Sequence, residues 1–220
     1  MLISTHLDIG CTVDAVRHCI YTFRRLLSPH YAVIPISGDA LIKEPWPPTC
    51  AMFVMPGGAD AGYCRVLNGE GNRRLRQYVE RGGAYLGFCA GAYYGSRRCE
   101  FEEGNKELEV VGDRELSFFP GICRGLAFPG FSYNSEAGTR AVKLDVPEDA
   151  FSQGSFAGAF RSYYNGGGVF VDAPLYQDRG VETLASYTET LNVNAGRGVS
   201  AVVYCKVGEG NVILCNTHPE

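Results

Sequence analysis

The sequence predicts an α/β protein with a doubly wound, mostly parallel sheet. Short apolar runs alternate with amphipathic segments of helical spacing through the first half of the chain, a pattern typical of a parallel sheet covered by helices on both faces. The chain has 220 residues, of which 45% are hydrophobic, and this length fits one α/β domain. We therefore expect a single domain over residues 1–220, with a β-rich excursion at roughly residues 100–170.

The first strand and the first helix are predicted within residues 2–27. Residues 2–5 form a short apolar run, and Thr12 can then cap a helix that ends before Ser28-Pro29. Apolar side chains recur along the helix at a spacing of three to four residues, which gives it one buried stripe. The stripe consists of Val13, Val16, Ile20, Phe23 and Leu27.

Strands and helices continue to alternate up to the middle of the chain. A helix is expected from Asn72 through Val79, because its apolar residues share one face and Gly82-Gly83 can supply a left-handed cap. A further helix is expected from Ala90. The predicted strands of this part are residues 31–36, 51–55 and 84–88.

The remainder of the chain is expected to be rich in strands. Acidic residues outnumber basic ones between residues 100 and 115, as on a solvated face. Residues 118–170 are rich in glycine, phenylalanine and tyrosine without helical spacing, so irregular strands and loops are expected there. The last predicted strands are residues 181–187, 201–207 and 212–215, the final two joined in a hairpin.

The composition excludes several classes of partner. Twenty basic residues against 24 acidic ones give a net charge of −4, so we expect no binding to nucleic acid or to an anionic membrane. No apolar run approaches the ~20 residues of a membrane span. The nine cysteines are scattered, and no metal-ligand spacing, phosphate loop or dinucleotide fingerprint occurs. We expect a cytoplasmic protein without metal or cofactor.

The segment Gly87-Phe88-Cys89-Ala90-Gly91 carries the clearest indication of chemistry, since it follows a predicted strand and precedes a predicted helix. A nucleophile on such a turn is held in a strained, exposed conformation, and small flanking residues let the neighbouring backbone pass. Free amides at the start of the helix can stabilise a thiolate and a developing oxyanion. The alternative is a cysteine that lies between two glycines by chance, but the strand before it favours Cys89 as a nucleophile.

A nucleophile of this kind needs a base, and the chain has four histidines. His218 follows the last predicted strand, at the sheet edge where open α/β folds bind ligands. Glu220 can orient its ring as the third member of a triad. An ordinary surface histidine near a frayed terminus is equally consistent with this position. The turn Pro56-Gly57-Gly58 and Ala90 supply the amides expected for an oxyanion hole.

Further polar residues are expected to line a pocket around this site. The run of residues 133–136 combines hydrogen-bond donors and acceptors with an acid. Asn165-Gly166-Gly167-Gly168 can present amides to an anion, although such a run is more often a turn. The candidate pocket residues are Asp60, Tyr93, Tyr133, Asn134, Ser135, Glu136 and Asn165.

Taken in order along the chain, these motifs resemble a known superfamily. A Pro-Gly-Gly turn, a cysteine elbow and a terminal His-Pro-Glu are similar to the class I glutamine amidotransferases, which implies a flavodoxin-like sheet. Additional motifs narrow the resemblance to the N-terminal domain of biotin-protein ligases, and it extends from the first strand to the last residue. These motifs are Pro56-Gly57-Gly58-Ala59-Asp60, Gly87-Phe88-Cys89-Ala90-Gly91, Phe118-Phe119-Pro120-Gly121, Tyr133-Asn134-Ser135-Glu136-Ala137-Gly138 and Tyr164-Asn165-Gly166-Gly167-Gly168.

The resemblance implies roles for three residues: Cys89 as nucleophile, His218 as base and Glu220 as the acid that orients the base. Glutamine amidotransferases usually carry a glutamine four residues after the nucleophile, whereas this chain has Tyr93 there, which leaves glutamine unestablished as the substrate. Neither the glycine- and arginine-rich loop nor the Lys-Trp-Pro-Asn motif of the biotin-ligase catalytic domain occurs. We therefore do not expect this chain to ligate biotin itself.

Two classes of function follow from these observations. The leading hypothesis is amide hydrolysis or acyl transfer through a thioester on Cys89, with a small-molecule or amide substrate. The alternative is a catalytically silent binding or regulatory module, associated with a biotin-protein ligase or its substrates. A pocket can be retained after its substrate-binding residues and its catalytic activity are lost. Redox sensing at Cys89 is a third hypothesis. The chain is expected to be either a fragment of a longer protein or a compact stand-alone form.

Overall fold

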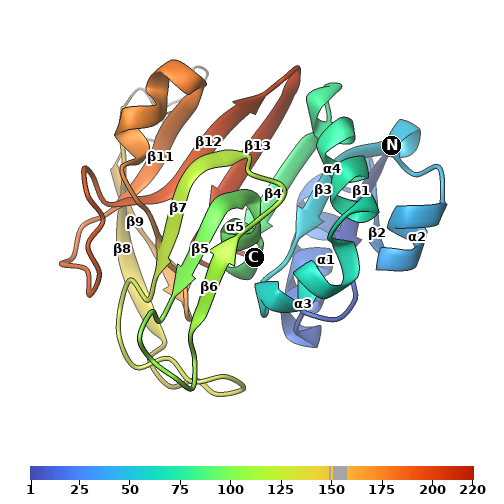
Figure 1. Ribbon diagram of the computed structural model, residues 1–220. Helices are drawn as coiled ribbons and strands as arrows, with labels where there is room; N and C mark the ends of the chain where they lie inside the picture. Colours follow the sequence, from blue (N-terminus) through green and yellow to red (C-terminus); the bar gives the residue numbers. More distant parts are fainter. Residues whose placement is uncertain (149, 151–157) are drawn as a thin grey trace.

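A computed structural model describes residues 1–148, 150 and 158–220. These residues form an α/β fold, with helices gathered over one half of the molecule and strands making up the other half (Figure 1). The strands are β1 (Leu2–His6), β2 (Ala32–Ile36), β3 (Cys50–Met55), β4 (Ala84–Phe88), β5 (Ser96–Phe101), β6 (Val110–Asp113), β7 (Phe119–Gly125), β8 (Arg140–Val146), β9 (Gly158–Tyr164), β10 (Val169–Phe170), β11 (Val181–Tyr187), β12 (Ser200–Val207) and β13 (Gly210–Cys215). The helices are α1 (Val13–Leu27), α2 (Gly38–Lys43), α3 (Asp60–Leu67), α4 (Glu70–Glu80), α5 (Ala90–Gly95) and two 3₁₀ turns, η1 (Pro47–Thr49) and η2 (Ala173–Arg179).

One sheet joins the described strands, in the order β2-β1-β3-β4-β13-β12-β10-β7-β5-β6, with β11, β8 and β9 attached through β12. The five strands β2, β1, β3, β4 and β13 run parallel to one another. Their carboxyl ends therefore meet at a single edge, which is where open α/β sheets bind ligands. The predicted α/β fold with its wound, parallel sheet is confirmed.

Helix α1 covers one face of the parallel strands. As predicted, Thr12 caps it, since the threonine hydroxyl accepts a hydrogen bond from the amide of Ala15 at 3.3 Å. The buried stripe of α1 includes Cys19 and Phe23, and the ring of Phe23 stacks on Phe88 of β4. The opposite, solvated side of the helix carries charged residues, as amphipathic spacing requires.

Helices α2 to α5 cover the other face and bury the larger core. Leu41, Leu67 and Leu75 are fully buried there, one from each of α2, α3 and α4. The sequence pattern did not predict α2 or α3, because each is too short for a periodic apolar stripe. Helix α4 begins at Glu70, two residues before the predicted start at Asn72.

Most strand pairs in the second half of the chain are antiparallel, and this half encloses a core of its own. Strands β12 and β13 pair as the predicted hairpin, with Val202 opposite Cys215 and Val207 opposite Gly210. Strand β8 pairs with both β9 and β11, and these strands bury a cluster that includes Phe128, Tyr164 and Tyr187. This cluster supports the loop after β9 from behind.

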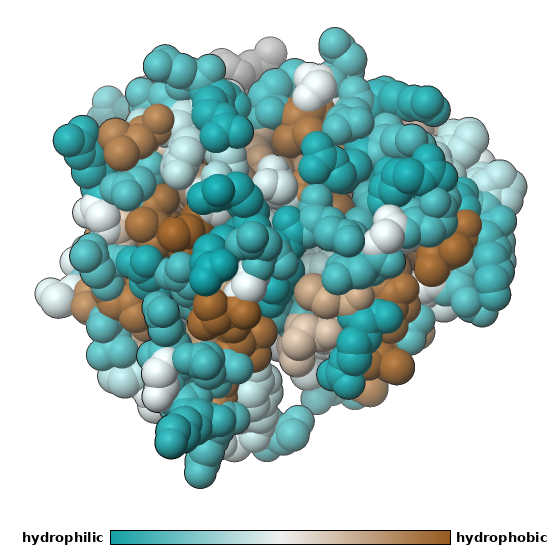
Figure 2. Space-filling model, in the orientation of Figure 1, coloured by the Kyte–Doolittle hydropathy of each residue, from teal (hydrophilic) through white to brown (hydrophobic). Residues whose placement is uncertain are grey.

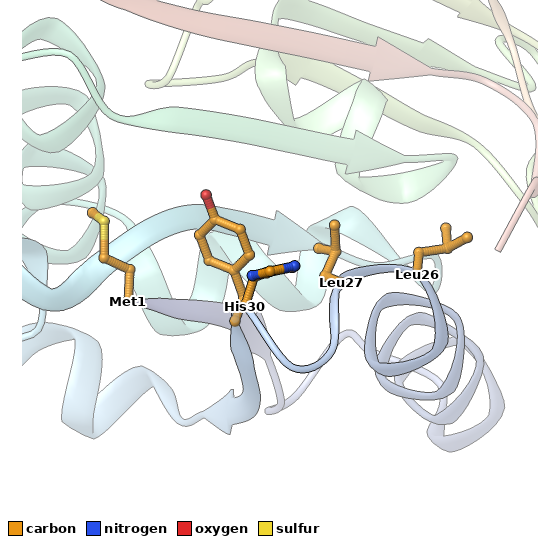
Figure 3. Close-up of a pocket in the computed structure, with 5 residues that line it drawn as sticks. Met1, Leu26, Leu27 and His30 are labelled. Carbon is orange, nitrogen blue, oxygen red and sulfur yellow. The ribbon is translucent and has the colours of Figure 1, made fainter.

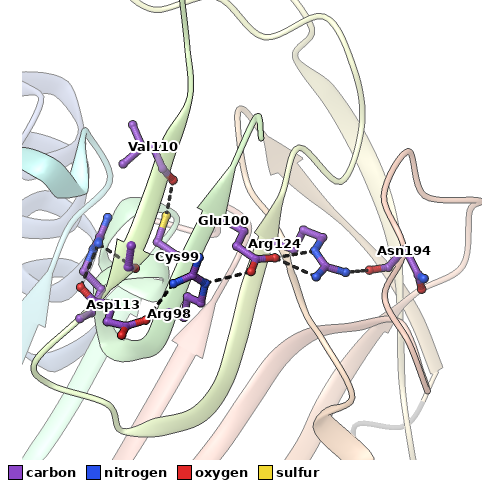
Figure 4. Close-up of polar contacts among 9 residues, drawn as sticks. Arg98, Cys99, Glu100, Val110, Asp113, Arg124 and Asn194 are labelled. Carbon is purple, nitrogen blue, oxygen red and sulfur yellow. Dashed lines mark hydrogen bonds and ion pairs between the residues drawn. The ribbon is translucent and has the colours of Figure 1, made fainter. Parts of the chain in front are cut away.

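Charged side chains link the strands β5, β6 and β7 on their outer face (Figure 4). Glu100 accepts hydrogen bonds from Arg98 at 3.0 Å and from Arg124 at 2.9 Å. Arg98 also bonds Asp113 of β6, and Arg124 donates to the carbonyl of Asn194. The Glu100 side chain is only 10% exposed, so this network fixes β5, the strand that carries Cys99 and ends at Phe101.

Candidate active site

Every residue predicted for the site lies in one cleft of about 1260 Å³. The cleft is built on the turns that follow β1, β3, β4 and β13, which are the carboxyl ends of the parallel strands. The surface is hollowed at its lower edge, between the helical half and the strand half (Figure 2). The predicted residues that line the cleft are Gly57, Gly58, Asp60, Cys89, Ala90, Tyr93, Tyr133, Asn134, Ser135, Glu136, Asn165, His218 and Glu220.

Cys89 occupies a strained turn between β4 and α5. Its φ of 46° lies in the left-handed region, which side chains other than glycine rarely adopt and which recurs at functional sites. The flanking glycines permit this turn: a Cβ on Gly87 would lie 2.5 Å from the Gly91 carbonyl oxygen, and a Cβ on Gly91 would lie 2.2 Å from the Met55 carbonyl oxygen. The elbow therefore requires small residues at both positions.

Cys89 is only 6% exposed, yet it lines the cleft. Its backbone amide donates to the Cys215 carbonyl at 2.8 Å, which ties the turn to the neighbouring strand β13. The Sγ atom donates to the carbonyl oxygen of Asn165 at 3.5 Å. Helix α5 has only six residues, so its macrodipole supplies less stabilisation of a thiolate than a long helix.

His218 lies beside Cys89 and is oriented from two sides. Its Nδ1 atom bonds Glu220 Oε1 at 2.8 Å, and its backbone amide donates to the Tyr163 carbonyl at 2.8 Å. Burial lowers the pKa of His218, but interactions with Cys89 and then Glu220 outweigh it, so that its pKa lies well above the ordinary value. The bond from Nδ1 to Glu220 leaves Nε2 for proton transfer.

The Pro-Gly-Gly turn after β3 forms the wall against which the His218 ring lies. A Cβ on Gly57 would be 2.6 Å from His218 Cε1, and one on Gly58 would be 1.9 Å from the Gly10 carbonyl oxygen. The Gly57 carbonyl accepts a hydrogen bond from the Tyr63 hydroxyl at 3.2 Å. The turn is thus rigid, and its two glycines allow the imidazole and the loop after β1 to approach closely.

Asp60 is held in an ion pair at the start of α3. Its carboxylate accepts hydrogen bonds from Arg114 Nε at 2.8 Å and lies 2.7 Å from the second nitrogen, NH2. Both side chains are more than nine-tenths buried. Sequence analysis did not find Arg114, because the two residues lie far apart along the chain and no motif links them. The pair joins α3 to the segment between β6 and β7 and satisfies the Asp60 charge.

Tyr93 lines the cleft with its ring, but its hydroxyl is engaged elsewhere. The hydroxyl donates to the Gly166 carbonyl at 3.3 Å and lies beneath Gly125 and Gly168, where a Cβ would collide with it. The side chain is almost fully buried. Tyr93 therefore fixes the loop after β9 against α5, so that the carbonyl of Asn165 stays near the thiol.

The loop over the cleft combines an aromatic wall with polar residues. The rings of Phe131 and Tyr133 meet edge to face at 4.9 Å, and Phe131 contacts Phe101 at 5.8 Å between ring centroids. Asn134, with a φ of 56°, turns the chain towards Ser135 and Glu136. The cleft wall is therefore apolar on one side and polar on the other.

Tyr163 is a cleft residue that sequence analysis missed. Its hydroxyl donates to Glu136 Oε2 at 2.6 Å, and its ring lies 6.0 Å from the His218 ring between centroids. Strand β9 directs Tyr164 into the core and Tyr163 towards the cleft, so the alternation of a strand was the signal that could have identified it.

The run Asn165-Gly166-Gly167-Gly168 is held to the protein by several of its backbone groups. The amide of Gly168 donates to Asn216 Oδ1 at 3.2 Å, and the Gly167 carbonyl accepts from Tyr164 and from Ala127. The Gly168 amide and the Gly167 carbonyl are therefore engaged within the protein. Asn165 lines the cleft, and its side-chain Oδ1 is a buried acceptor without a partner among the described residues.

A second, shallower pocket of about 390 Å³ lies at the other end of the sheet. Its lining includes Met1, Leu26, Leu27 and His30, between the start of β1 and the end of α1 (Figure 3). It contains no thiol and no carboxylate, so it does not offer comparable chemistry. In the described part of the chain, no cluster of three or more ligating side chains could hold a metal ion. No helix there has the length and apolar character that crossing a bilayer requires.

Comparison with known proteins identifies the family. The family described as "Biotin-protein ligase, N terminal" matches residues 1–220. The biotin–protein ligase of Schizosaccharomyces pombe is 43% identical over 202 residues, which are 90% of this chain and 30% of that protein. The chain therefore spans less than a third of that relative.

Solved structures share the fold at low sequence identity. A structure of PurLQS from Thermotoga maritima superposes with a TM-score of 0.57 at 15% identity, over 99% of this chain and 86% of that one. A ThuA-like protein from Bacteroides uniformis gives 0.61 at 14% identity, over 99% and 81%. These likenesses agree with the glutamine amidotransferase-like fold that the motifs predicted. The chain belongs to the family of biotin-protein ligase N-terminal domains.

Proposed function

We propose that this domain is a cysteine-dependent amidase or acyl transferase that acts through a thioester on Cys89. The observation that carries the proposal is the strained elbow of Cys89 beside His218, whose Nδ1 bonds Glu220 at 2.8 Å. A nucleophile, a base and an orienting acid in a cleft are the parts that nucleophilic catalysis requires. The raised pKa of His218, to which Cys89 and then Glu220 contribute, supports a protonated imidazole beside Cys89.

The first half-reaction forms the acyl-enzyme. Cys89 Sγ bonds to the carbonyl carbon of the substrate, and the π electrons move to oxygen to give a tetrahedral oxyanion. When this intermediate collapses, the carbon–nitrogen bond breaks and the amine leaves with the proton that His218 Nε2 carried. Backbone amides of Gly58 and Ala90, with Gly57 completing the turn, are the proposed donors to the oxyanion.

The second half-reaction releases the product. Water, or an acceptor amine or alcohol, gives a proton to His218 while its oxygen or nitrogen attacks the thioester carbon. The carbon–sulfur bond then breaks, the thiolate of Cys89 re-forms and the acyl group leaves as an acid, ester or amide. Glu220 holds the imidazole in position through both steps, because its bond to Nδ1 fixes the ring and stabilises the imidazolium.

Acyl-enzyme trapping tests this proposal. The protein is incubated with short-chain p-nitrophenyl esters, quenched in acid and examined by intact and peptide mass spectrometry. We expect the mass of one acyl group on Cys89, its absence in Cys89→Ala and slower labelling in His218→Ala. Cys11→Ala is the matched control, since Cys11 lines the same cleft, and it should be acylated like the wild type. Equal acylation of the wild type and Cys89→Ala would contradict the proposal.

A second candidate function is a silent binding module that acts with a biotin-protein ligase. Tyr93 favours it, because this side chain stands where related amidotransferases carry a substrate-recognising glutamine and its hydroxyl bonds Gly166 instead. The similarity to the S. pombe ligase motivates a ligase or its substrates as partner. This function predicts that Cys89→Ala leaves affinity for an isolated ligase domain unchanged in a titration, with no acyl-enzyme formed by the wild type.

A further inference from the structure

The carboxylates of the cleft differ in how their charge is compensated. The described lining residues include four carboxylates and neither lysine nor arginine. Three of the four have a cationic partner: Asp14 pairs with Arg17, Asp60 with Arg114 and Glu220 with His218. The fourth, Glu136, accepts a hydrogen bond from the Tyr163 hydroxyl. The cleft therefore has an excess of negative charge that is centred on Glu136.

The partner of Glu136 stays uncharged at physiological pH. Burial, followed by the interaction with Glu136, raises the pKa of Tyr163 to about 12. The hydrogen bond of 2.6 Å holds the carboxylate over the cleft without neutralising it. The ring of Tyr163 also lies 6.0 Å from the His218 ring between centroids, so one side chain links Glu136 to the proposed base.

The neighbouring wall suits a cation as well. Phe101, Phe131 and Tyr133 lie in mutual ring contact within the same loop cluster, and all three line the cleft. Aromatic faces carry partial negative charge and attract ammonium groups. Asn165, which also lines the cleft, has a buried side-chain Oδ1 that can accept a hydrogen bond from a donor such as N–H.

We propose that this cleft selects cationic or neutral acyl substrates and excludes anionic ones, with Glu136 as the specificity-determining residue. The inference rests on the proposed function of Cys89 and names the substrate class for it. An ammonium or amide group near the scissile carbonyl of a substrate can donate a hydrogen bond to the Glu136 carboxylate. A carboxylate at the same place is repelled by this uncompensated negative charge.

Two thiol reagents of similar size test the charge preference without a known substrate. The cationic probe is 2-(trimethylammonium)ethyl methanethiosulfonate and the anionic probe is 2-sulfonatoethyl methanethiosulfonate. Each rate at Cys89 is resolved by peptide mass spectrometry and divided by the rate with 2-mercaptoethanol, which removes the intrinsic reactivity of the probe. We expect the normalised rate of the cationic probe to exceed that of the anionic probe by about fivefold or more. The carboxylate attracts the first probe and repels the second, so both effects enter the ratio. Raising the salt concentration to 0.5 M should reduce it.

Three variants assign the preference to the carboxylate. Glu136→Gln keeps an acceptor for Tyr163 and removes the charge, and it should lower the ratio by about threefold, since Glu136 is exposed and screened. Tyr163→Phe keeps the charge but removes the hydrogen bond that holds it, so its ratio should lie between those of the wild type and Glu136→Gln. Glu182→Gln is the matched control, because Glu182 is exposed on β11 and outside the cleft.

The outcomes separate this inference from the proposed function. If Cys89 reacts fast but with a normalised ratio near one, or with a ratio that favours the anionic probe, the proposed substrate class is wrong. The proposed role of Cys89 as nucleophile is then unaffected. A ratio that Glu136→Gln does not change overturns the assignment to this carboxylate. If Cys89 reacts with both probes no faster than Cys11, the nucleophile fails and the substrate class fails with it.

Discussion

His6 at the end of β1 makes the stability of this protein depend on pH. The side chain is fully buried against Phe53 and Tyr63, and neither ring nitrogen has a hydrogen-bond partner among the described residues. Burial lowers the pKa of His6 to about 4, although Asp8 raises it slightly. The folded protein therefore holds a neutral imidazole at pH values where the unfolded chain binds a proton.

The size of the effect follows from the two pKa values. Below the unfolded pKa of about 6.5 the unfolded chain gains a proton that the folded ring binds only near pH 4. Stability is therefore lost as the pH falls between these values. At about 1.4 kcal/mol per pH unit, the loss is about 2 kcal/mol at pH 5 and about 3 kcal/mol at pH 4.

Urea unfolding of the wild type and of His6→Leu measures this loss. Leucine has a similar volume and no proton to bind, so at pH 7 the variant should be at least as stable as the wild type. The difference in the free energy of unfolding should then grow by about 2 kcal/mol between pH 7 and pH 5. His30→Gln is the control, since His30 is exposed. If the free energies of unfolding of the wild type and of His6→Leu change with pH in the same way, the reasoning is refuted.

Two further predictions concern the site and its support. Gly57→Ala should slow iodoacetamide alkylation of Cys89 by up to about a hundredfold, because the new Cβ would lie 2.6 Å from His218 Cε1 and move the ring. If the alkylation rate and the melting temperature are both unchanged, His218 is not the base. Arg114→Leu should cost about 3–5 kcal/mol in urea unfolding by leaving the Asp60 carboxylate buried and unpaired. The double variant with Asp60→Asn should recover most of that loss, and a failure to recover would show that packing dominates.

The regular parts of the fold could be predicted because their signals are local. Thr12 begins α1 and the apolar spacing to Leu27 sets its length, so propensity and packing agree. Helix α3 could not be predicted, since it begins within a glycine-rich segment and is positioned by contacts across the fold. A Cβ on Gly62, for example, would lie 2.4 Å from Gly10 Cα. Such tertiary close approach leaves no periodic pattern.

The site residues could be predicted only where a motif marks them. Cys89 and His218 follow strands whose carboxyl ends converge, and topology alone brings them to one edge. Arg114 and Tyr163 carry no such mark, because their partners Asp60 and Glu136 lie 54 and 27 residues away along the chain. The hydroxyl of Tyr93 donates to the Gly166 carbonyl. Tertiary packing decides whether a tyrosine hydroxyl bonds the backbone in this way or faces a substrate, and no sequence motif marks the difference.

The central claim is that Cys89 is a nucleophile activated by His218. The most direct test is the rate of iodoacetamide alkylation at each cysteine between pH 6 and pH 9, resolved by peptide mass spectrometry in the wild type and in His218→Ala. We predict that Cys89 reacts several-fold faster than the other thiols at pH 6.5, and that His218→Ala abolishes this advantage. If Cys89 reacts no faster than the other thiols, or if its pH profile is the same in both proteins, the claim is wrong.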